Sequence, residues 1–373
     1  MPIAFMAKGK FWVNNHAHIV VGNDKADTRY LMYAMQSTDV SGYLTGAVMP
    51  KLTQGNLNRI PLPCPPLDVQ LDIIRILGDL DDKIELNRQI NQTLEQIAQT
   101  IFKSWFVDFE PVKAKIEAKA AGRDPERAAM CAISGKLEPE LDQLPPEQYQ
   151  QLAATAALFP DELVESELGL IPVGWEVRSL PEAIEVNPSR TLRKGTVAPY
   201  LDMANVPTNS ARVADVIHRE FSSGSKYMNG DTLLARITPC LENGKTAYVD
   251  FLARNQVGWG STEFIVFRPK APLPEAFGYL LCRHPEFRNF AIANMSGTSG
   301  RQRVPNDCFA NYKLSVPNYG VTSAFGEIAG SIMGGIKARD EESRTLATLR
   351  DTLLPKLLSG ELSVENLPLE ATA

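Results

Sequence analysis

Two long stretches of the chain repeat apolar residues at spacings of three and four, the pattern of a helix with one apolar stripe. They predict helices over 67–109 and 322–360, each about 55 Å long at ~1.5 Å per residue. Such helices are too long for a small core and are better explained as an antiparallel or coiled pair, with Asn87, Asn91, Arg339 and Ser343 as polar breaks in the seam. The matching apolar positions, at a constant offset of 252, are Leu94, Ile97, Ile101, Phe102 and Trp105 in the first stretch and Leu346, Leu349, Leu353, Leu354 and Leu357 in the second.

A second repeat concerns strands. The segment Lys10–Val21, "KFWVNNHAHIVV", alternates apolar and polar residues and predicts a strand. Its end, Ile19–Val21, recurs 246 positions later as Ile265–Phe267. Further echoes follow in the same order, so the chain contains a repeat of about 250 residues. These echoes are Tyr30-Leu31 with Tyr279-Leu280, Gly46 with Gly300, and "RIPLP" (Arg59–Pro63) with "KLSVP" (Lys313–Pro317).

The two copies differ in length, because about 85 residues that precede the strand in the second copy have no counterpart before Met1. We therefore expect Met1–Leu57 to be poorly packed, or to lean on the second domain or a partner, and Ser166–Pro317 to fold on its own. The predicted parts are a partial first domain (1–66), a long helix (67–109), an acidic linker with short helices (110–165), a complete second domain (166–317), and a second long helix with a tail (318–373).

Composition indicates a globular protein of two or more domains, with 373 residues and 44% hydrophobic residues. No apolar run reaches the roughly 18 residues of a membrane span, and the N-terminus lacks the apolar core of a signal peptide. The five cysteines are scattered, which fits a reducing cytoplasm and argues against structural zinc.

Charge alternates along the chain. Residues 1–66 and 167–317 each carry a net charge of +3, whereas 67–166 carry −9 and 318–373 carry −3. A net charge of +3 is a weak indication of nucleic-acid binding, but the alternation indicates units with different roles.

Catalytic motifs are absent from the sequence: there is no phosphate-binding loop, dinucleotide-binding glycine motif or nucleophile elbow. Asp108, Glu110 and Lys113 could form a nuclease-like cluster, but they follow a helix end in an acidic linker. His16 and His18 share a strand face without a third ligand nearby, so a surface role is favoured over metal binding.

Polar loops in the second copy are the strongest candidates for a binding site. Arg and Lys can pair with guanine or phosphate, Asn and Gln with adenine, and Ser and Thr with either. Ordinary solvated loops are the alternative explanation. The candidates are Arg236, Thr238, Asn243, Lys245, Ser261, Thr262, Thr298, Arg301, Gln302 and Arg303, with Lys51 as the one cation retained at the corresponding place in the first copy.

The apolar stripes of the long helices predict mutual packing, and they could also leave a face for other proteins. Trp105, Phe106, Leu353 and Leu357 lie near the helix ends and are candidates for binding a partner or the other helix.

Several phrases in this order, and their duplication, resemble the specificity subunit of type I restriction–modification enzymes. They include "LGLIPVGWEVRSL", "GDTLLARITPCLENGKTA", "STEFIVFRP" and "LRDTLLPKLLSGEL", and the resemblance covers nearly the whole chain. It implies an α+β fold in which two mixed α/β target-recognition domains are separated by two long, packed, antiparallel coiled-coil-like helices. The polar loops would contact double-stranded DNA, and the helices would set the spacing between two half-sites.

The same resemblance implies a cytoplasmic, non-catalytic subunit that docks methylation (M) subunits, joined by restriction (R) subunits. No cofactor is expected on this chain, while S-adenosylmethionine, ATP and Mg belong to the partners. Three alternatives remain open: a truncated subunit, which could restore a two-domain reader as a homodimer; a coiled-coil interaction protein that has lost DNA reading; and a stand-alone nuclease.

Overall fold

The computed structural model describes residues 3–14, 17–46, 50–298 and 300–363. The chain divides into two compact units. Unit 1 comprises Met1–Gln89 and Arg339–Ala373, and unit 2 comprises Ile90–Ala338. The division passes through both long helices, so each helix contributes one part to each unit. The domain limits inferred from the sequence remain predictions.

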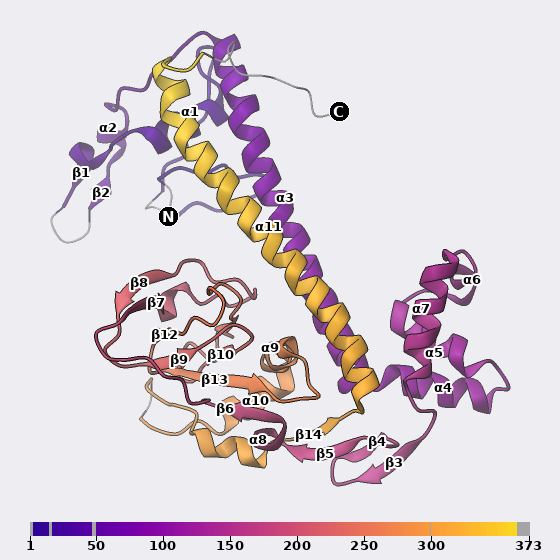
Figure 1. Cartoon of the computed structure of the whole chain (residues 1–373). Coiled ribbons are helices and arrows are strands. Elements are labelled where there is room, and N and C mark those ends of the chain that lie inside the picture. The colour runs from indigo at the N-terminus through magenta and orange to yellow at the C-terminus, as the bar shows by residue number, and fades with distance from the viewer. Residues whose placement is uncertain (1–2, 15–16, 47–49, 299, 364–373) are drawn as a thin grey trace. The chain divides into compact units, whose positions relative to one another are not determined.

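The two long helices are α3 (Leu67–Phe106, 40 residues) and α11 (Tyr319–Ser359, 41 residues), as the apolar periodicity predicts (Figure 1). Helix α3 ends three residues before the predicted end. Phe109 has φ 55°, the left-handed conformation that an α-helix of L-residues does not continue. Within the described ranges, no helix is both long enough and apolar enough to cross a membrane.

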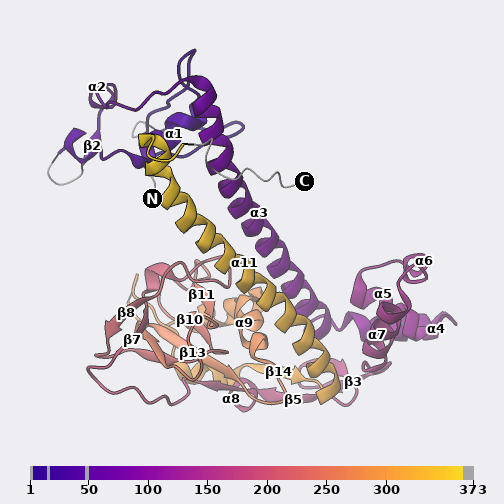
Figure 2. The same ribbon diagram turned by 45° about the horizontal axis from the view of Figure 1, so that its top comes forward.

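The polar breaks in the helix seam are confirmed as interhelical contacts. In unit 1, Asn87 Nδ2 donates to Glu342 Oε2 at 2.8 Å and Ser343 Oγ at 3.3 Å. In unit 2, Asn91 Nδ2 donates to the Ile336 carbonyl at 3.1 Å. The later residue of α3, Asn91, contacts an earlier residue of α11 than Asn87 does, so the two helices run antiparallel. Figures 1 and 2 show them side by side.

Unit 1 is held by a small core in which helix α1 packs on the long helices. Asp27 caps α1 by accepting from the amides of Arg29 and Tyr30, and Tyr30 and Tyr33 are completely buried. Their neighbours in this core include Ile73 and Leu77 of α3 and Leu354 and Leu357 of α11. The other elements are η1 (Ser41–Tyr43), β1 (Leu44–Thr45), β2 (Lys51–Leu52) and α2 (Gln54–Leu57), with α1 spanning Thr28–Ser37.

The predicted strand at Lys10–Val21 is wrong for the described part of this segment, which has no strand structure. Trp12 is 96% exposed and Val21 is 71% exposed. Its counterpart Ile265–Phe267 lies in a strand paired on both sides, by β10 (Thr232–Ala235) and by β6 (Ile184–Val186). A strand forms only where a neighbour accepts its backbone hydrogen bonds, and the described residues offer none beside residues 17–21. His16 lies outside the described residues.

The described part of unit 2 contains two four-stranded sheets, in the orders β11-β10-β13-β6 and β8-β7-β12-β9. In the first, β10 pairs antiparallel with β13, with Leu233 opposite Val266. Two antiparallel two-stranded sheets complete the strands: the hairpin β3-β4, and the pair β14-β5, whose strands are far apart in the sequence. The bounds are β3 (Leu163–Ser166), β4 (Gly169–Pro172), β5 (Glu176–Ser179), β6 (Ile184–Val186), β7 (Val197–Leu201), β8 (Ile217–Glu220), β9 (Ser225–Tyr227), β10 (Thr232–Ala235), β11 (Thr246–Tyr248), β12 (Gly258–Gly260), β13 (Phe264–Pro269) and β14 (Lys313–Val316).

Helices complete unit 2. Four of them, α4 to α7, fill the stretch predicted as a linker, with a core of their own around Met130 and Leu141. Their bounds are α4 (Glu110–Ala120), α5 (Pro125–Ser134), α6 (Glu138–Leu141) and α7 (Pro146–Ala157); the remaining helices are α8 (Leu180–Ala183), α9 (Glu275–Arg283), α10 (Pro285–Ala293), η2 (Met203–Asn205) and η3 (Asn306–Asn311).

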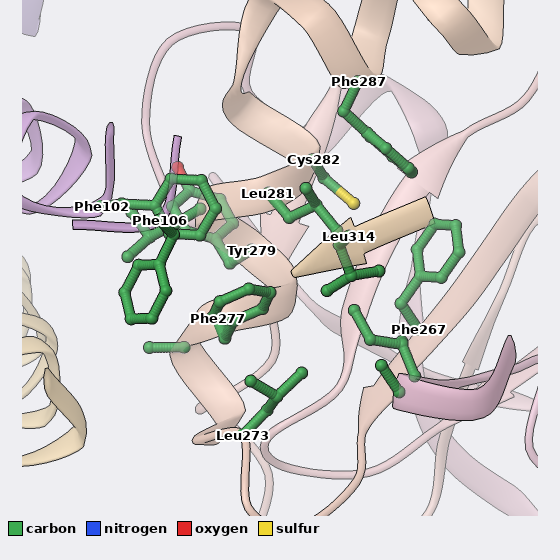
Figure 3. Close-up of a cluster of buried hydrophobic side chains, with 14 of the residues drawn as sticks. Phe102, Phe106, Phe267, Leu273, Phe277, Tyr279, Leu281, Cys282, Phe287 and Leu314 are labelled. Carbon is green, nitrogen blue, oxygen red and sulfur yellow. The ribbon is translucent and has the colours of Figure 1, made fainter. Parts of the chain in front are cut away.

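Aromatic side chains at the end of α3 belong to the core of unit 2. Figure 3 shows Phe102 and Phe106 beside Phe277 of α9, with ring centroids 5.1 and 5.2 Å from the Phe277 ring. Trp105 is 1% exposed and packs edge-on against Phe159 at 4.9 Å. Both rings also contact Phe325 of α11, with centroids 5.9 and 4.7 Å away. Of the two roles predicted for Trp105 and Phe106, the structure therefore shows packing against the other long helix, and side chains this buried present no surface to a partner. In unit 1, Leu357 is 4% exposed and Leu353 packs against the same core, so both hold the long helices to α1.

Candidate nucleic-acid interface

Three of the predicted loops in unit 2 meet at the ends of two strands. Arg236 follows β10, and its amide donates to the Glu263 carbonyl in the loop between β12 and β13 at 2.9 Å. The amide of Val304, at the end of the Ser296–Val304 loop, donates to the Arg236 carbonyl at 2.9 Å. The guanidinium of Arg236 donates to the carbonyl of Val304. Because backbone bonds join all three segments, the loops form one surface.

The charged side chains of this surface differ in what neutralises them. Arg303 forms a two-pronged ion pair with the carboxylate of Glu263, with distances of 2.7 to 2.9 Å. This pairing raises the pKa of Arg303. Arg301 is exposed, and no carboxylate of the described residues lies within ion-pair distance of it. Arg301 is therefore the better placed of the two to meet a ligand.

The uncharged candidates in these loops support the backbone or face solvent. Thr238 and Gln302 exchange two bonds: the Thr238 amide donates to the Gln302 carbonyl at 3.1 Å, and the Gln302 amide donates to Thr238 Oγ1 at 3.2 Å. Ser261 Oγ accepts from the Glu263 amide at 3.1 Å. Thr262 and Thr298 are exposed.

Three candidates lie apart from the loop contacts just described. Lys245 Nζ donates to the Met203 carbonyl at 2.6 Å, which ties it to η2. Asn243 is exposed in the turn after Pro239. Lys51 belongs to unit 1, where it is exposed on β2.

A pocket of about 350 Å³ opens beside Arg236, between the two four-stranded sheets of unit 2. Ser225 on β9 of one sheet donates through Oγ to the Phe264 carbonyl on β13 of the other at 2.8 Å. The lining residues are Asn187, Pro188, Ser189, Arg190, Gly224, Ser225, Lys226, Arg236, Thr262, Phe264, Val266 and Asn306.

The pocket includes polar residues that sequence reasoning missed. Asn187 was not among the candidates, yet it lines the pocket with φ 53°. Its amide donates to the Val266 carbonyl at 2.7 Å, and its side-chain Oδ1 accepts from the Val266 amide at 2.9 Å. Arg190 and Lys226 carried no motif, because they lie on segments about 36 residues apart in the sequence that only the sheet packing unites.

Gly224 permits the close approach of the two strands at the pocket wall. It has φ 153°, and a Cβ atom there would lie 2.0 Å from the Gly260 carbonyl oxygen. Only glycine fits at this position without moving backbone.

Behind the pocket, a buried carboxylate organises two of the cations. Asp231 is completely buried and pairs with Arg190 at 3.1 Å and with Arg268 at 3.4 Å. It also accepts from the Met228 amide at 2.7 Å. Burial raises the pKa of Asp231 while the amide bond and the two arginines oppose that rise. One carboxylate thus serves two arginines.

Of the candidate metal and nuclease-like residues, the structure places those in the part of the chain that it describes. No group of three His, Cys, Asp or Glu side chains there could hold a metal ion. In the proposed nuclease-like cluster, Asp108 is paired with Lys103 instead. His18 Nε2 lies 2.8 Å from the Leu52 carbonyl.

Comparison with known proteins identifies the family. Residues 3–96 match the model of the type I restriction modification DNA specificity domain. The chain is 31% identical over 330 residues to the type I restriction enzyme HindI specificity subunit of Haemophilus influenzae, covering 84% of this chain and 71% of the relative. It is 23% identical to the MjaIX specificity subunit of Methanocaldococcus jannaschii, covering 98% and 77% of the two chains.

A similar solved structure is the type I restriction–modification system S subunit from M. genitalium, with a TM-score of 0.44, 13% identity, and coverage of 89% of this chain and 73% of that one. The assignment depends on the sequence match to the HindI subunit, which extends over most of both chains. The chain belongs to the family of type I restriction enzyme specificity subunits.

Proposed function

We propose that this chain recognises double-stranded DNA and directs a type I methyltransferase and restriction complex to its target. The observation that supports this most is membership of the specificity-subunit family, with the HindI relative matched over 84% of the chain. In unit 2, the loops that carry Arg236, Arg301 and Thr262 form one surface, and Arg301 has no carboxylate partner among the described residues. Exposed cations with neighbouring polar groups are what DNA backbone and base edges require.

The finer parts of the proposal concern the partners. The chain itself carries out no catalysis, and S-adenosylmethionine, ATP and Mg belong to methylation and restriction subunits. The antiparallel helices α3 and α11 set the spacing of two half-sites and dock the methylation subunits. The seam contacts of Asn87 and Asn91 support this role, because a fixed helix register is what a spacer needs. Formation of a homodimer remains part of the proposal and is tested by the mass of the complex in solution.

The test selects DNA from a random duplex library with the full chain bound to its methylation subunits. We expect enrichment of one sequence pattern. Replacing Arg301 with Ala should weaken binding by about 1–3 kcal/mol and relax the choice at one base pair if Arg301 contacts a guanine. The control is Arg254→Ala, which removes an exposed arginine of the same unit outside these loops.

Two outcomes would contradict the proposal. If the complex assembles but enriches no sequence, the chain acts as a helical interaction protein. If the pure chain cleaves DNA in the presence of Mg²⁺, it is a nuclease.

A further inference from the structure

We propose that the pocket between the two sheets of unit 2 binds one phosphate of the DNA backbone. This inference rests on the proposed function and adds to it a site that fixes the position of the DNA without reading its sequence. The site is defined by Arg190, Lys226 and Arg236, which contribute three cationic side chains to the lining, and by Ser225 and Thr262, which contribute hydroxyl groups. Among the residues that the structure describes, no carboxylate lines the pocket.

The first argument is the charge that remains after the internal contacts are counted. Lys226 Nζ donates to the Arg190 carbonyl at 3.1 Å and lies 5.2 Å from the Phe221 ring centroid. The Arg236 guanidinium donates to the Val304 carbonyl. Carbonyls and rings hold these groups in place without cancelling their charge, and neither has a carboxylate within ion-pair distance among the described residues. The pocket is thus a preorganised positive site.

The second argument concerns Arg190. Its carboxylate partner Asp231 is shared with Arg268, which also pairs with Glu275 at 3.2 Å, so Asp231 does not serve Arg190 alone. The Nε donor of Arg190 and the Nε donor of Arg236 are both buried without a hydrogen-bond partner. Unsatisfied buried donors are rare in proteins and call for an explanation. An anion in the pocket supplies one, because a small turn of either guanidinium directs its donor to a phosphate oxygen.

The third argument selects a phosphate over a base edge. A guanine edge also presents acceptors to Arg or Lys, but a base edge carries no net charge. The cations here are donors only, and the carboxylate oxygens that could accept from a base are turned to the interior at Asp231. A phosphate diester offers acceptors and a negative charge, which is what this lining complements.

Lys226→Gln tests the site, with Lys270→Gln as a matched control. Lys270 is an exposed lysine of the same unit whose ammonium also donates to a carbonyl, that of Pro181 at 2.7 Å, but it lies outside the pocket. Binding of the full chain with its methylation subunits to labelled duplexes is measured by fluorescence anisotropy over a salt series. We expect Lys226→Gln to weaken binding to every duplex alike and to reduce the slope of log K against log salt by about 1. The ratio of wild-type to variant affinity should then fall about threefold to fourfold between about 50 and 200 mM salt. Lys270→Gln should leave the slope unchanged.

A chemical test changes the DNA instead of the protein and measures the wild-type and Lys226→Gln complexes on the same set of duplexes. Single phosphates of the bound duplex are replaced one at a time by neutral methylphosphonates. One position should weaken binding by the wild-type complex and have no further effect on the Lys226→Gln complex, which identifies the phosphate in the pocket.

The outcomes separate this inference from the proposed function. If the wild-type complex has no sequence preference, the proposed function fails. If it has one but Lys226→Gln and Lys270→Gln give the same slope, only the pocket assignment fails. If Lys226→Gln changes the preferred base at one position but leaves the salt slope unchanged, the pocket reads a base and the phosphate assignment is overturned. Inorganic phosphate alone could instead stabilise the wild-type protein against unfolding but not the Lys226→Gln variant. If the slope of log K against log salt for DNA is unchanged at the same time, the pocket binds a free anion and the assignment to a DNA phosphate is overturned.

Discussion

Glu95 of α3 is a carboxylate buried in unit 2, where it ties the helix to α9 and to the loop at Ala211. It accepts from the Ala211 amide at 2.9 Å and from the Tyr279 hydroxyl, and Arg283 lies 3.6 Å away. Burial raises the pKa of Glu95, and these partners oppose that rise. The folded protein therefore retains the proton on Glu95 at pH values where the unfolded chain, with an ordinary glutamate pKa of about 4.3, has lost it.

The stability that Glu95 contributes should consequently fall as pH rises. It is fully present below the unfolded pKa and is lost as pH rises through the folded pKa. Urea unfolding of wild type and Glu95→Gln from pH 4 upward should give a difference in unfolding free energy that shrinks with rising pH.

Glu182 provides a control of opposite sign in the same unit. Its carboxylate accepts from the hydroxyl and amide of Ser179, which lowers the pKa of Glu182. The difference between wild type and Glu182→Gln should therefore grow as pH rises through the acid range. If the difference in unfolding free energy between wild type and Glu95→Gln stays constant or grows with pH, the hydrogen-bond and charge partners of Glu95 lower its pKa by more than burial raises it.

At the scale of residues, the sequence indicated which types of side chain form the candidate site better than it indicated which residues lie together in the folded chain. It gave Arg236 and Thr262 as candidates, and both line the pocket. It missed Lys226 and Arg190, and it did not show that Arg303 is neutralised by Glu263, 40 residues away. Contacts of that separation depend on strand order and packing, which no local pattern encodes.

At the scale of elements, Asn87 shows how a polar residue fixes the register of the helix pair. It is 1% exposed, and its amide nitrogen donates to Glu342 and Ser343. Asn87→Asp should place a second carboxylate against Glu342 and destabilise unit 1 by roughly 1–3 kcal/mol, because a buried donor becomes an unpaired acceptor. Urea unfolding should show a larger loss at neutral pH than at acidic pH, where the new carboxyl is protonated.

Asn87→Leu is the matched control. Glu342 retains Lys83 at 3.7 Å, and Ser343 retains its bond to the Arg339 carbonyl at 2.8 Å. An apolar side chain in the seam should therefore cost less than about 1 kcal/mol. Equal losses for the two variants would mean that the charge at Glu342 does not matter.

Helices and strands could be predicted from the sequence to the extent that each satisfies its own backbone hydrogen bonds. The helices satisfy their own backbone hydrogen bonds, so periodicity predicted α3 and α11 closely. Tyr30 and Tyr279, aligned in the repeat, are both completely buried on helices. The strand echoes failed in the first copy: "KLSV" forms β14 paired with β5, whereas the equivalent "RIPL" forms no strand. A strand depends on a neighbour, which the segment's own letters do not specify.

At the scale of the whole molecule, the two units have separate cores. Leu77 belongs to the core of unit 1 and Phe309 to that of unit 2, and both are completely buried. Leu77→Ala and Phe309→Ala should each cost about 2–5 kcal/mol in their own unit. Native-state hydrogen exchange should show lost protection in α1 for the first and in β10 and β13 for the second.

Each of these substitutions is the control for the other. If the units open separately, protection changes only in the unit that carries the substitution. If either substitution lowers protection equally in both units, the continuous helices α3 and α11 make the chain open as one cooperative body.

The two copies of the repeated strand sequence, near residues 10–21 and 265–267, also differ in how accessible they are to a protease. Phe267 is 1% exposed within β13, so a protease specific for aromatic residues reaches it only after unit 2 unfolds. Phe11 and Trp12 are 53% and 96% exposed in backbone that belongs to no strand or helix. Brief digestion with chymotrypsin should therefore remove the first residues of the chain from molecules whose unit 2 is still intact. The size of the remaining fragment then reports folding of unit 2 without a spectroscopic probe.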